Sequence, residues 1–185
     1  MHNIPNLISV MRLLLVPLTV WLIISGAYGW AFITFMAAGI SDGIDGYLAR
    51  RFDWRTRLGA YLDPLADKAL LVSVYVTLGL LKLLPAWLGI LVVSRDALIV
   101  GAVLLSRLMD HPVRVRPLMV SKVNTVAQIA FAVSVLGVAA LGKPLAMLVD
   151  FGGIPVALLT ALSGAAYLAS WLRHMAEQPH EDHRP

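Results

Sequence analysis

The sequence predicts an all-α integral membrane protein with six transmembrane helices and with both termini in the cytoplasm. Of its 185 residues, 59% are hydrophobic and only 14% are charged, whereas a soluble domain usually carries about 25% charged residues. The apolar residues lie in long continuous runs rather than on alternating faces. A run of about 20 apolar residues is long enough to cross a bilayer as a helix, and six such runs can be counted.

The first three predicted helices lie at residues 7–25, 30–50 and 58–83. Arg12 interrupts the first run near its start. The connection 26–29 is a short turn with two glycines, and the connection 51–57 is a charged loop with three arginines.

The last three predicted helices lie at residues 86–108, at 118–141 and within 145–171. Pro85 precedes the fourth helix and Pro144 precedes the sixth, and both mark breaks because proline lacks the backbone N–H of a helix interior. We expect one domain at residues 1–174, followed by a polar C-terminal tail at 175–185. We expect no cleavable signal, because the start lacks a charged leader.

Lysine and arginine residues are unevenly distributed between the connections. Arginines lie in the connections 51–57 and 110–117 and after the last helix, whereas the opposite connections contain only Lys82 and Lys143. Loops with an excess of Lys and Arg stay on the cytoplasmic side of a membrane. Both termini and the arginine-rich loops are therefore predicted to face the cytoplasm.

Two pairs of aspartates interrupt the second and third apolar runs. Asp42 and Asp45 are three residues apart, and Asp63 and Asp67 are four apart, so each pair shares one helix face. Charged side chains inside a membrane are costly and indicate a functional site by default. Because the two helices are antiparallel neighbours joined by a short loop, we expect the pairs to converge in a cavity open to the cytoplasm. Four carboxylates suit two hard cations such as Mg²⁺, Mn²⁺ or Ca²⁺.

The spacing of these residues resembles the signature of the CDP-alcohol phosphatidyltransferases at every specified position. The pattern is Asp42-x2-Asp45-Gly46-x2-Ala49-Arg50-x8-Gly59-x3-Asp63-x3-Asp67. The stretch 3–12 is also similar to the entry helix of this family, and six helices is the family's number. The resemblance implies exchange of the CMP of a CDP-linked lipid for an alcohol, two divalent cations (Mg²⁺ or Mn²⁺) and a homodimer.

The resemblance also implies roles for individual residues. Asp42, Asp45, Asp63 and Asp67 would hold the metal ions, and Asp67 would also act as general base on the acceptor hydroxyl. Residues for binding the CDP-lipid would be Gly46, Ala49, Arg50, Gly59 and Asn6. The small residues among them have an alternative explanation, because small side chains let membrane helices pack closely. Asn6 has one too, since an asparagine at this place is also typical of an ordinary helix cap.

The acceptor alcohol is indicated by stretches outside the signature. The stretches 63–68, 94–96 and 121–125 resemble the CDP-alcohol-type cardiolipin synthases of mitochondria and some bacteria, which implies CDP-diacylglycerol as donor and phosphatidylglycerol as acceptor. We expect a bacterial inner membrane location. Related enzymes that make phosphatidylglycerol phosphate carry similar residues, so glycerol 3-phosphate is the alternative acceptor. Arg95 and Lys122 are expected to bind the acceptor's phosphate. Asp96 is explained equally well as a structural partner of Arg95 and as a ligand-binding residue. For Lys122, an interfacial lysine that reaches water is the alternative to phosphate binding.

Other classes of function are less well supported. There is no dense basic run with interleaved aromatics, so no nucleic-acid partner is expected, and the absence of cysteine excludes disulfides and Cys-based zinc sites. A cation transporter is the non-enzyme alternative, because buried aspartates also mark ion pathways. A transporter predicts charges near the midplane, whereas here all four aspartates lie toward one side together with Arg50.

Overall fold

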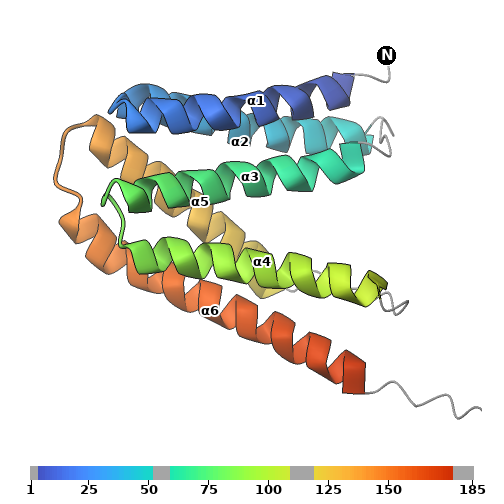
Figure 1. Cartoon of the computed structure of the whole chain (residues 1–185). Helices are drawn as coiled ribbons and strands as arrows, with labels where there is room; N and C mark the ends of the chain where they lie inside the picture. Colours follow the sequence, from blue (N-terminus) through green and yellow to red (C-terminus); the bar gives the residue numbers. More distant parts are fainter. Residues whose placement is uncertain (1–3, 52–58, 109–118, 177–185) are drawn as a thin grey trace, which may run out of the picture.

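The computed structural model contains six α-helices, and no strand occurs in the described residues. The helices are α1 (Ile4–Ile24), α2 (Tyr28–Arg51), α3 (Gly59–Leu80), α4 (Ala86–Leu108), α5 (Met119–Ala140) and α6 (Ala146–Ala176) (Figure 1). The backbone is described at residues 4–51, 59–108 and 119–176, and side chains are described at 11–41, 43, 66, 68–101 and 119–172. The predicted all-α class and helix order are confirmed, with ends that shift by a few residues.

The helices run back and forth, so that alternate connections lie at the same end of the bundle (Figure 1). The start of α1, the end of α2, the start of α3 and the end of α6 share one end. The predicted arginine-rich connections and most of the tail fall on residues 52–58, 109–118 and 177–185, which lie outside the described residues. Helix α1 therefore begins, and α6 ends, at the same end of the bundle, as a prediction of six consecutive spans requires (Figure 1). Which side of a membrane they face stays a prediction.

Helix α1 is the packing partner that α2 and α3 share. It lies along both of them, whereas in the described part of the chain α2 and α3 contact each other over only a short stretch. The expectation that the two aspartate-bearing helices are close neighbours therefore holds only in part. Helix α5 packs against α2 and α6, and α4 packs against α3 and α6, so these contacts join the two halves of the bundle.

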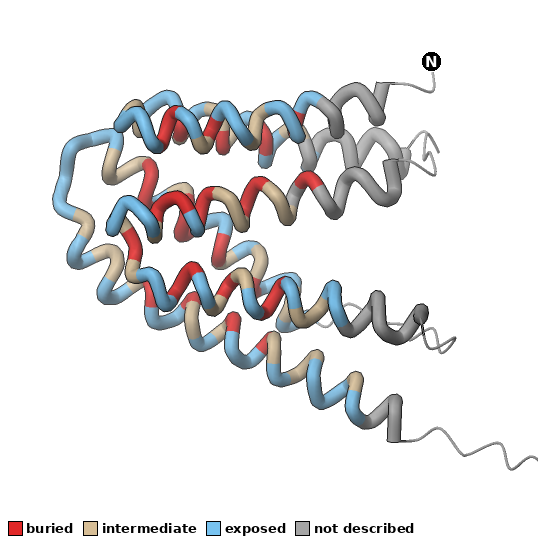
Figure 2. Tube along the Cα trace, in the orientation of Figure 1, coloured by how far each residue is buried: buried red, intermediate tan, exposed pale blue. Residues whose placement is uncertain are grey.

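The outer surface of the bundle is apolar. Trp21, Trp30, Leu80, Met147 and Phe151 are each more than 60% exposed, and Figure 2 shows exposed and buried residues alternating along the helices. Among the described residues, Met119–Ala140 and Ala146–Leu172 are long and apolar enough to cross a membrane, and shorter apolar helices cover parts of α1, α2 and α3. The structure therefore supports six helices, of which two also qualify as spans by length and composition.

The three turns at the other end of the bundle are built in the same way. Gly26, Lys82 and Gly142 have φ angles of 74°, 59° and 63°. In each turn the next residue donates its N–H to a carbonyl five positions back: Ala27 to Leu22, Leu83 to Leu78 and Lys143 to Val138. This is the Schellman pattern that ends many helices. Glycine is the usual residue there because it has no Cβ, and Lys82 takes that place at the end of α3.

Packing of α6 on α5 depends on a glycine. A Cβ added at Gly152 would lie 2.8 Å from Cε2 of Phe131, and Phe131 is only 5% exposed, so its ring has little room to move. We expect Gly152→Ala to destabilise the protein by about 1–3 kcal/mol, the usual cost of overpacking. This cost outweighs the helix-propensity gain of about 1 kcal/mol. Thermal unfolding in detergent would measure it.

The adjacent glycine supplies the matched control. A Cβ at Gly153 would lie 3.7 Å from Cδ2 of Leu88, which is ordinary van der Waals contact. Gly153→Ala should therefore be as stable as the wild type or more so. Equal stability of the two variants would contradict the packing argument.

Candidate functional site

The signature residues lie at one end of the bundle. Asp42 and Asp45 belong to the last turns of α2, and Asp63 and Asp67 belong to the first turns of α3. At 1.5 Å per residue, Asp45 lies about 9 Å before the end of α2 and Asp63 about 6 Å after the start of α3. The backbone thus places both pairs within about two and a half turns of the same end. Their side chains lie outside the described residues, so their convergence stays a prediction.

The other predicted donor-binding residues share this end. Gly46, Ala49 and Arg50 lie in the last turns of α2, Gly59 is the first residue of α3, and Asn6 is in the first turn of α1. Among the described side chains, no group of three His, Asp or Glu residues could hold a metal ion. The side chains of the four signature aspartates lie outside the described residues. Carboxylate oxygens are the ligands that Mg²⁺ and Mn²⁺ prefer.

Arg95 on α4 is buried and held by three helices. Its Nη1 donates to Asp96 Oδ1 at 2.6 Å, and its Nη2 donates to Ser163 Oγ at 2.7 Å on α6 and to Ser121 Oγ on α5. Its Nε also donates to Ser163 Oγ, at 3.2 Å. The ring of Tyr167 lies 5.9 Å from the guanidinium carbon. A buried charge in an apolar bundle needs such partners. Pairing with Asp96, one of the two interpretations that the sequence left open, is observed.

Asp96 links Arg95 to the third helix. Its Oδ1 accepts from Arg95 and also from Nζ of Lys68, and Lys68 directly follows Asp67. Asp96 Oδ2 is buried, and no hydrogen-bond partner for it lies in the described part of the chain. We call Lys68, Arg95, Asp96, Ser121, Ser163 and Tyr167 the Arg95 cluster. It joins the aspartate-bearing helix α3 to α4, α5 and α6.

Lys122, the other predicted acceptor-binding residue, lies outside this cluster. It follows Ser121, which bonds Arg95, but its own side chain is exposed near the start of α5. Neighbouring residues on a helix point in different directions, which explains why one residue faces the cluster and the next does not. The two predicted acceptor residues are thus close in the fold but do not share one buried site.

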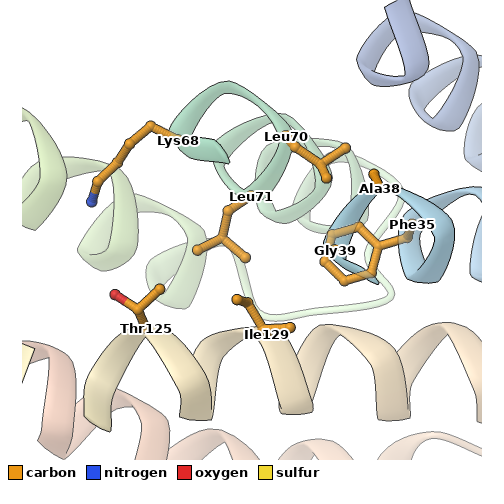
Figure 3. A pocket seen from close by; sticks show the side chains of 8 residues that line it. All are labelled: Phe35, Ala38, Gly39, Lys68, Leu70, Leu71, Thr125 and Ile129. Atoms are coloured by element: carbon orange, nitrogen blue, oxygen red, sulfur yellow. The ribbon is translucent and has the colours of Figure 1, made fainter. Parts of the chain in front are cut away.

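A cavity of about 170 Å³ lies beside Lys68, between α2, α3 and α5. It is lined by Phe35, Ala38, Gly39, Lys68, Leu70, Leu71, Thr125 and Ile129. In Figure 3 the polar ends of Lys68 and Thr125 lie on one side, and Phe35, Ala38 and Gly39 lie on the other. Pockets for whole small molecules measure about 300–1,000 Å³. This cavity therefore suits part of a molecule, with an apolar segment and a polar end.

A second polar group lies between α5 and α6 and has a structural role. Gln128 Nε2 donates to Thr160 Oγ1 at 3.0 Å, and Thr160 Oγ1 lies 2.9 Å from Asn124 Oδ1. Tyr75 on α3 donates to the Gln128 carbonyl at 3.0 Å. Asn124, Gln128 and Thr160 are fully buried. Asn124 and Gln128 on α5 thus bond across to Thr160 on α6.

Arg12 is a buried residue to which the sequence assigned no role beyond interrupting the first apolar run. It is 1% exposed and lies about 12 Å into α1 at 1.5 Å per residue. Asp67 lies about 12 Å into α3 by the same measure, and α1 packs along both α2 and α3. The signal that would have found Arg12 is the high cost of a charge within an apolar run.

Comparison with known proteins adds a family and several relatives. The family model of the CDP-alcohol phosphatidyltransferases matches residues 2–171. The chain is 37% identical over 151 residues to "CDP-diacylglycerol–glycerol-3-phosphate 3-phosphatidyltransferase 1, chloroplastic" of Oryza sativa subsp. japonica, covering 72% of this chain and 46% of that protein. It is 36% identical over 143 residues to "Cardiolipin synthase (CMP-forming)" of Homo sapiens, covering 69% and 48%.

A bacterial relative has the same name as the human one. The chain is 37% identical over 116 residues to "Cardiolipin synthase (CMP-forming)" of Streptomyces coelicolor, covering 60% of this chain and 54% of that protein. The chain spans about half the length of the curated relatives it matches. These names divide between a glycerol-3-phosphate phosphatidyltransferase and CMP-forming cardiolipin synthases.

Proposed function

The chain belongs to the CDP-alcohol phosphatidyltransferase family, and from this premise we propose that it is a membrane enzyme that makes cardiolipin. It would transfer the phosphatidyl group of CDP-diacylglycerol to a hydroxyl of phosphatidylglycerol and release CMP. The observation that carries this proposal is the family match over residues 2–171, which includes every position of the aspartate signature. Relatives named cardiolipin synthase support the choice of acceptor.

The donor end of the proposed site consists of the signature residues. Asp42, Asp45, Asp63 and Asp67 would hold two divalent cations, Mg²⁺ or Mn²⁺, by the oxygen ligands that these ions prefer. When bound, the cations would neutralise the diphosphate of the donor and make CMP a better leaving group. Support comes from the backbone, which brings all four positions to one end of α2 and α3.

The chain's own residues would then bind and orient the substrates. Asp67 would accept the proton of the acceptor hydroxyl, and Arg50 would bind a diphosphate oxygen. Gly46, Ala49 and Gly59 would leave room for the cytidine diphosphate beside Asn6. These positions all lie at the same end of α1, α2 and α3, which supports binding of one ligand by all of them.

The acceptor end of the proposed site lies near α4 and α5. Arg95 and Lys122 would supply positive charge for the acceptor's phosphate. The Arg95 cluster supports this role, because it brings the two cations Lys68 and Arg95 together with Asp96 between α3, α4 and α5. Glycerol 3-phosphate is the alternative acceptor, favoured by the name of the rice relative. Both acceptors carry a phosphate, so the same cations would serve either.

The proposal also covers the cellular location and the oligomeric state of the protein. We infer that the protein is a homodimer in a bacterial inner membrane, with both termini and the active site toward the cytoplasm. The apolar outer surface supports a lipid environment, and the arginine-rich connections support the orientation. Membership in a family of transferases favours the enzyme over a cation transporter.

One assay decides between the acceptors. Purified protein is supplied with CDP-diacylglycerol and with either phosphatidylglycerol or glycerol 3-phosphate, and CMP and lipid products are followed. We expect CMP and cardiolipin with phosphatidylglycerol, and neither with CDP-diacylglycerol alone. Product formed only from glycerol 3-phosphate would refute the cardiolipin assignment in favour of the alternative.

A further inference from the structure

Arg12 ends a buried stripe on α1. Its side chain is 1% exposed, and Thr19 and Ile23 are fully buried, while Val16 packs against the core. These four positions have the spacing i, i+4, i+7 and i+11, which places them on one face of a helix. Arg12 is the member nearest the start of α1. The stripe therefore carries its one charge toward the end of the bundle where the aspartate signature lies.

Helices α2 and α3 have buried stripes of the same spacing. The three members of each stripe are at most 5% exposed: Ala31, Phe35 and Ala38 on α2, and Leu78, Val74 and Leu71 on α3. One further step of four residues toward the signature end reaches Asp42 on α2 and Asp67 on α3. The side chains of these two aspartates lie outside the described residues, so they are placed by the register of their helices alone. Each of the three stripes thus ends in a charged residue.

A hydrogen bond between α1 and α2 fixes the level of Arg12 relative to Asp42. Thr19 Oγ1 donates to Thr34 Oγ1 at 3.1 Å. Toward the signature end, Arg12 lies about 10.5 Å beyond Thr19 along α1, at 1.5 Å per residue. By the same measure Asp42 lies about 12 Å beyond Thr34 along α2, and Asp45 lies nearly one turn further. Arg12 and Asp42 are therefore at nearly the same level of two helices that pack against each other.

Asp67 lies at a similar level on α3. It is as far from the start of its helix as Arg12 is from the start of α1, and both helices start at the same end of the bundle (Figure 1). Helix α1 packs along α3 as it does along α2. A buried arginine needs an anionic partner, because an uncompensated charge in an apolar interior is strongly destabilising. The carboxylates of α1, α2 and α3 are the four signature aspartates, and those at the level of Arg12 are Asp42 and Asp67.

We propose that Arg12 is a positioning residue of the aspartate site and pairs with the carboxylates of Asp42 and Asp67. A guanidinium has five donors in a planar fork, enough to bind one oxygen of each carboxylate and leave the other oxygens for the cations. Arg12 is then the internal counter-charge that keeps the site formed when metal ions are absent. This inference rests on metal binding by the aspartates in the proposed function. It assigns a role to a residue outside the aspartate signature.

The first test compares thermal unfolding of the full chain in EDTA and in saturating Mg²⁺. Arg12→Met keeps an apolar stem and removes the charge. In EDTA it should lower Tm by about 10 °C, because breaking a buried ion pair leaves a charge without its partner. In Mg²⁺ this deficit should fall to about half or less, because the cations bring more positive charge to the carboxylates than the arginine did.

Two variants serve as controls. Thr19→Val removes a buried hydrogen bond of the same stripe without changing a charge, so its effect on Tm should be the same in EDTA and in Mg²⁺. Arg12→Lys keeps the charge, so in EDTA it should be more stable than Arg12→Met. A merely structural role predicts that the deficit of Arg12→Met is equal in both buffers. That result, or a deficit that grows with Mg²⁺, overturns the inference.

A double-variant cycle in EDTA tests the pairing itself. Asp42→Asn should stabilise the Arg12→Met protein by at least about 4 °C more than it stabilises the wild type, because it removes a carboxylate that has lost its counter-charge. Asp45→Asn is the matched control, since position 45 lies nearer the end of α2, and its effect should differ less between the two backgrounds. An equal effect of Asp42→Asn in both backgrounds overturns the pairing.

The cycle stays informative if Arg12→Met does not fold in EDTA, as loss of a buried charge partner allows. Recovery of folded protein on adding Asp42→Asn then supports the pairing, and failure of that recovery overturns it.

These outcomes are separate from those of the transferase proposal, because none of the measurements needs turnover. If the inference is overturned, CMP release by the wild type leaves the transferase standing. If the wild type releases no CMP but the cycle shows the coupling of Arg12 to Asp42, the transferase proposal fails and the pairing holds. If Mg²⁺ does not stabilise the wild type, metal binding fails, and the cycle in EDTA alone decides the pairing.

Discussion

Asp67→Asn should abolish CMP release, with turnover lower by at least about 10²–10⁴-fold, the range that a general base contributes. Asparagine keeps the size of the side chain but removes its charge and its capacity to accept a proton. It would also weaken metal binding, because an amide is a poorer ligand than a carboxylate for a hard cation. CMP release from CDP-diacylglycerol and acceptor, measured in matched detergent, reports the loss.

The control for this substitution is another aspartate. Asp150 is exposed on α6 near the turn at the opposite end of the bundle, so Asp150→Asn should keep wild-type turnover. Asp67→Asn should also elute and unfold like the wild type, since the change is nearly isosteric. Normal turnover by a folded Asp67→Asn protein would exclude the proposed role of this residue.

The helices were predictable because their signal is local. Long apolar runs and the glycines at 26 and 142 are visible in the sequence, and both glycines do end helices as caps. The end of α3 was predicted at residue 83 but lies at Leu80. Its cap is Lys82, in a left-handed conformation with φ of 59°. A lysine carries no sequence signal for this conformation, so the turn comes from the tertiary structure.

The site was predictable only where its residues form a fixed pattern. The aspartate signature gives positions at the ends of two helices, and the helices place those positions at one end of the bundle. The contact between Lys68 and Asp96 joins residues 28 apart in sequence, and it depends on how α3 packs against α4. No spacing rule predicts such a contact, and the sequence assigned no substrate-binding role to Lys68.

Arg12 shows a different limit of the sequence. A single arginine in an apolar run is compatible with an interfacial side chain that reaches water, and its burial depends on helices that pack around it. The structure makes it one of the largest fully buried side chains, in the helix that contacts both aspartate-bearing helices. Within the described residues, α2 and α3 contact this third helix more than they contact each other.

Removal of divalent cations should stop the reaction completely. Protein treated with EDTA should release no CMP, and Mg²⁺ or Mn²⁺ should restore turnover. In the proposed site the four carboxylates would repel one another in a medium of low dielectric constant, so bound ions would serve the folded state as well as the reaction. We therefore expect the cations to raise thermal stability, by about 2.7 kcal/mol at a concentration 100 times their dissociation constant.

The stability measurement makes the metal prediction independent of activity. Asp63→Asn should lose most of the stabilisation by Mg²⁺, whereas Asp150→Asn should retain it. Asp63→Asn without added metal should be no less stable than the wild type without metal, because one of four repelling charges is gone. Turnover that resists EDTA, or stabilisation by Mg²⁺ that is equal in both variants, would contradict metal binding at the aspartates. A rise in stability that depends on Asp63 would place the cations at the signature even before an acceptor is identified.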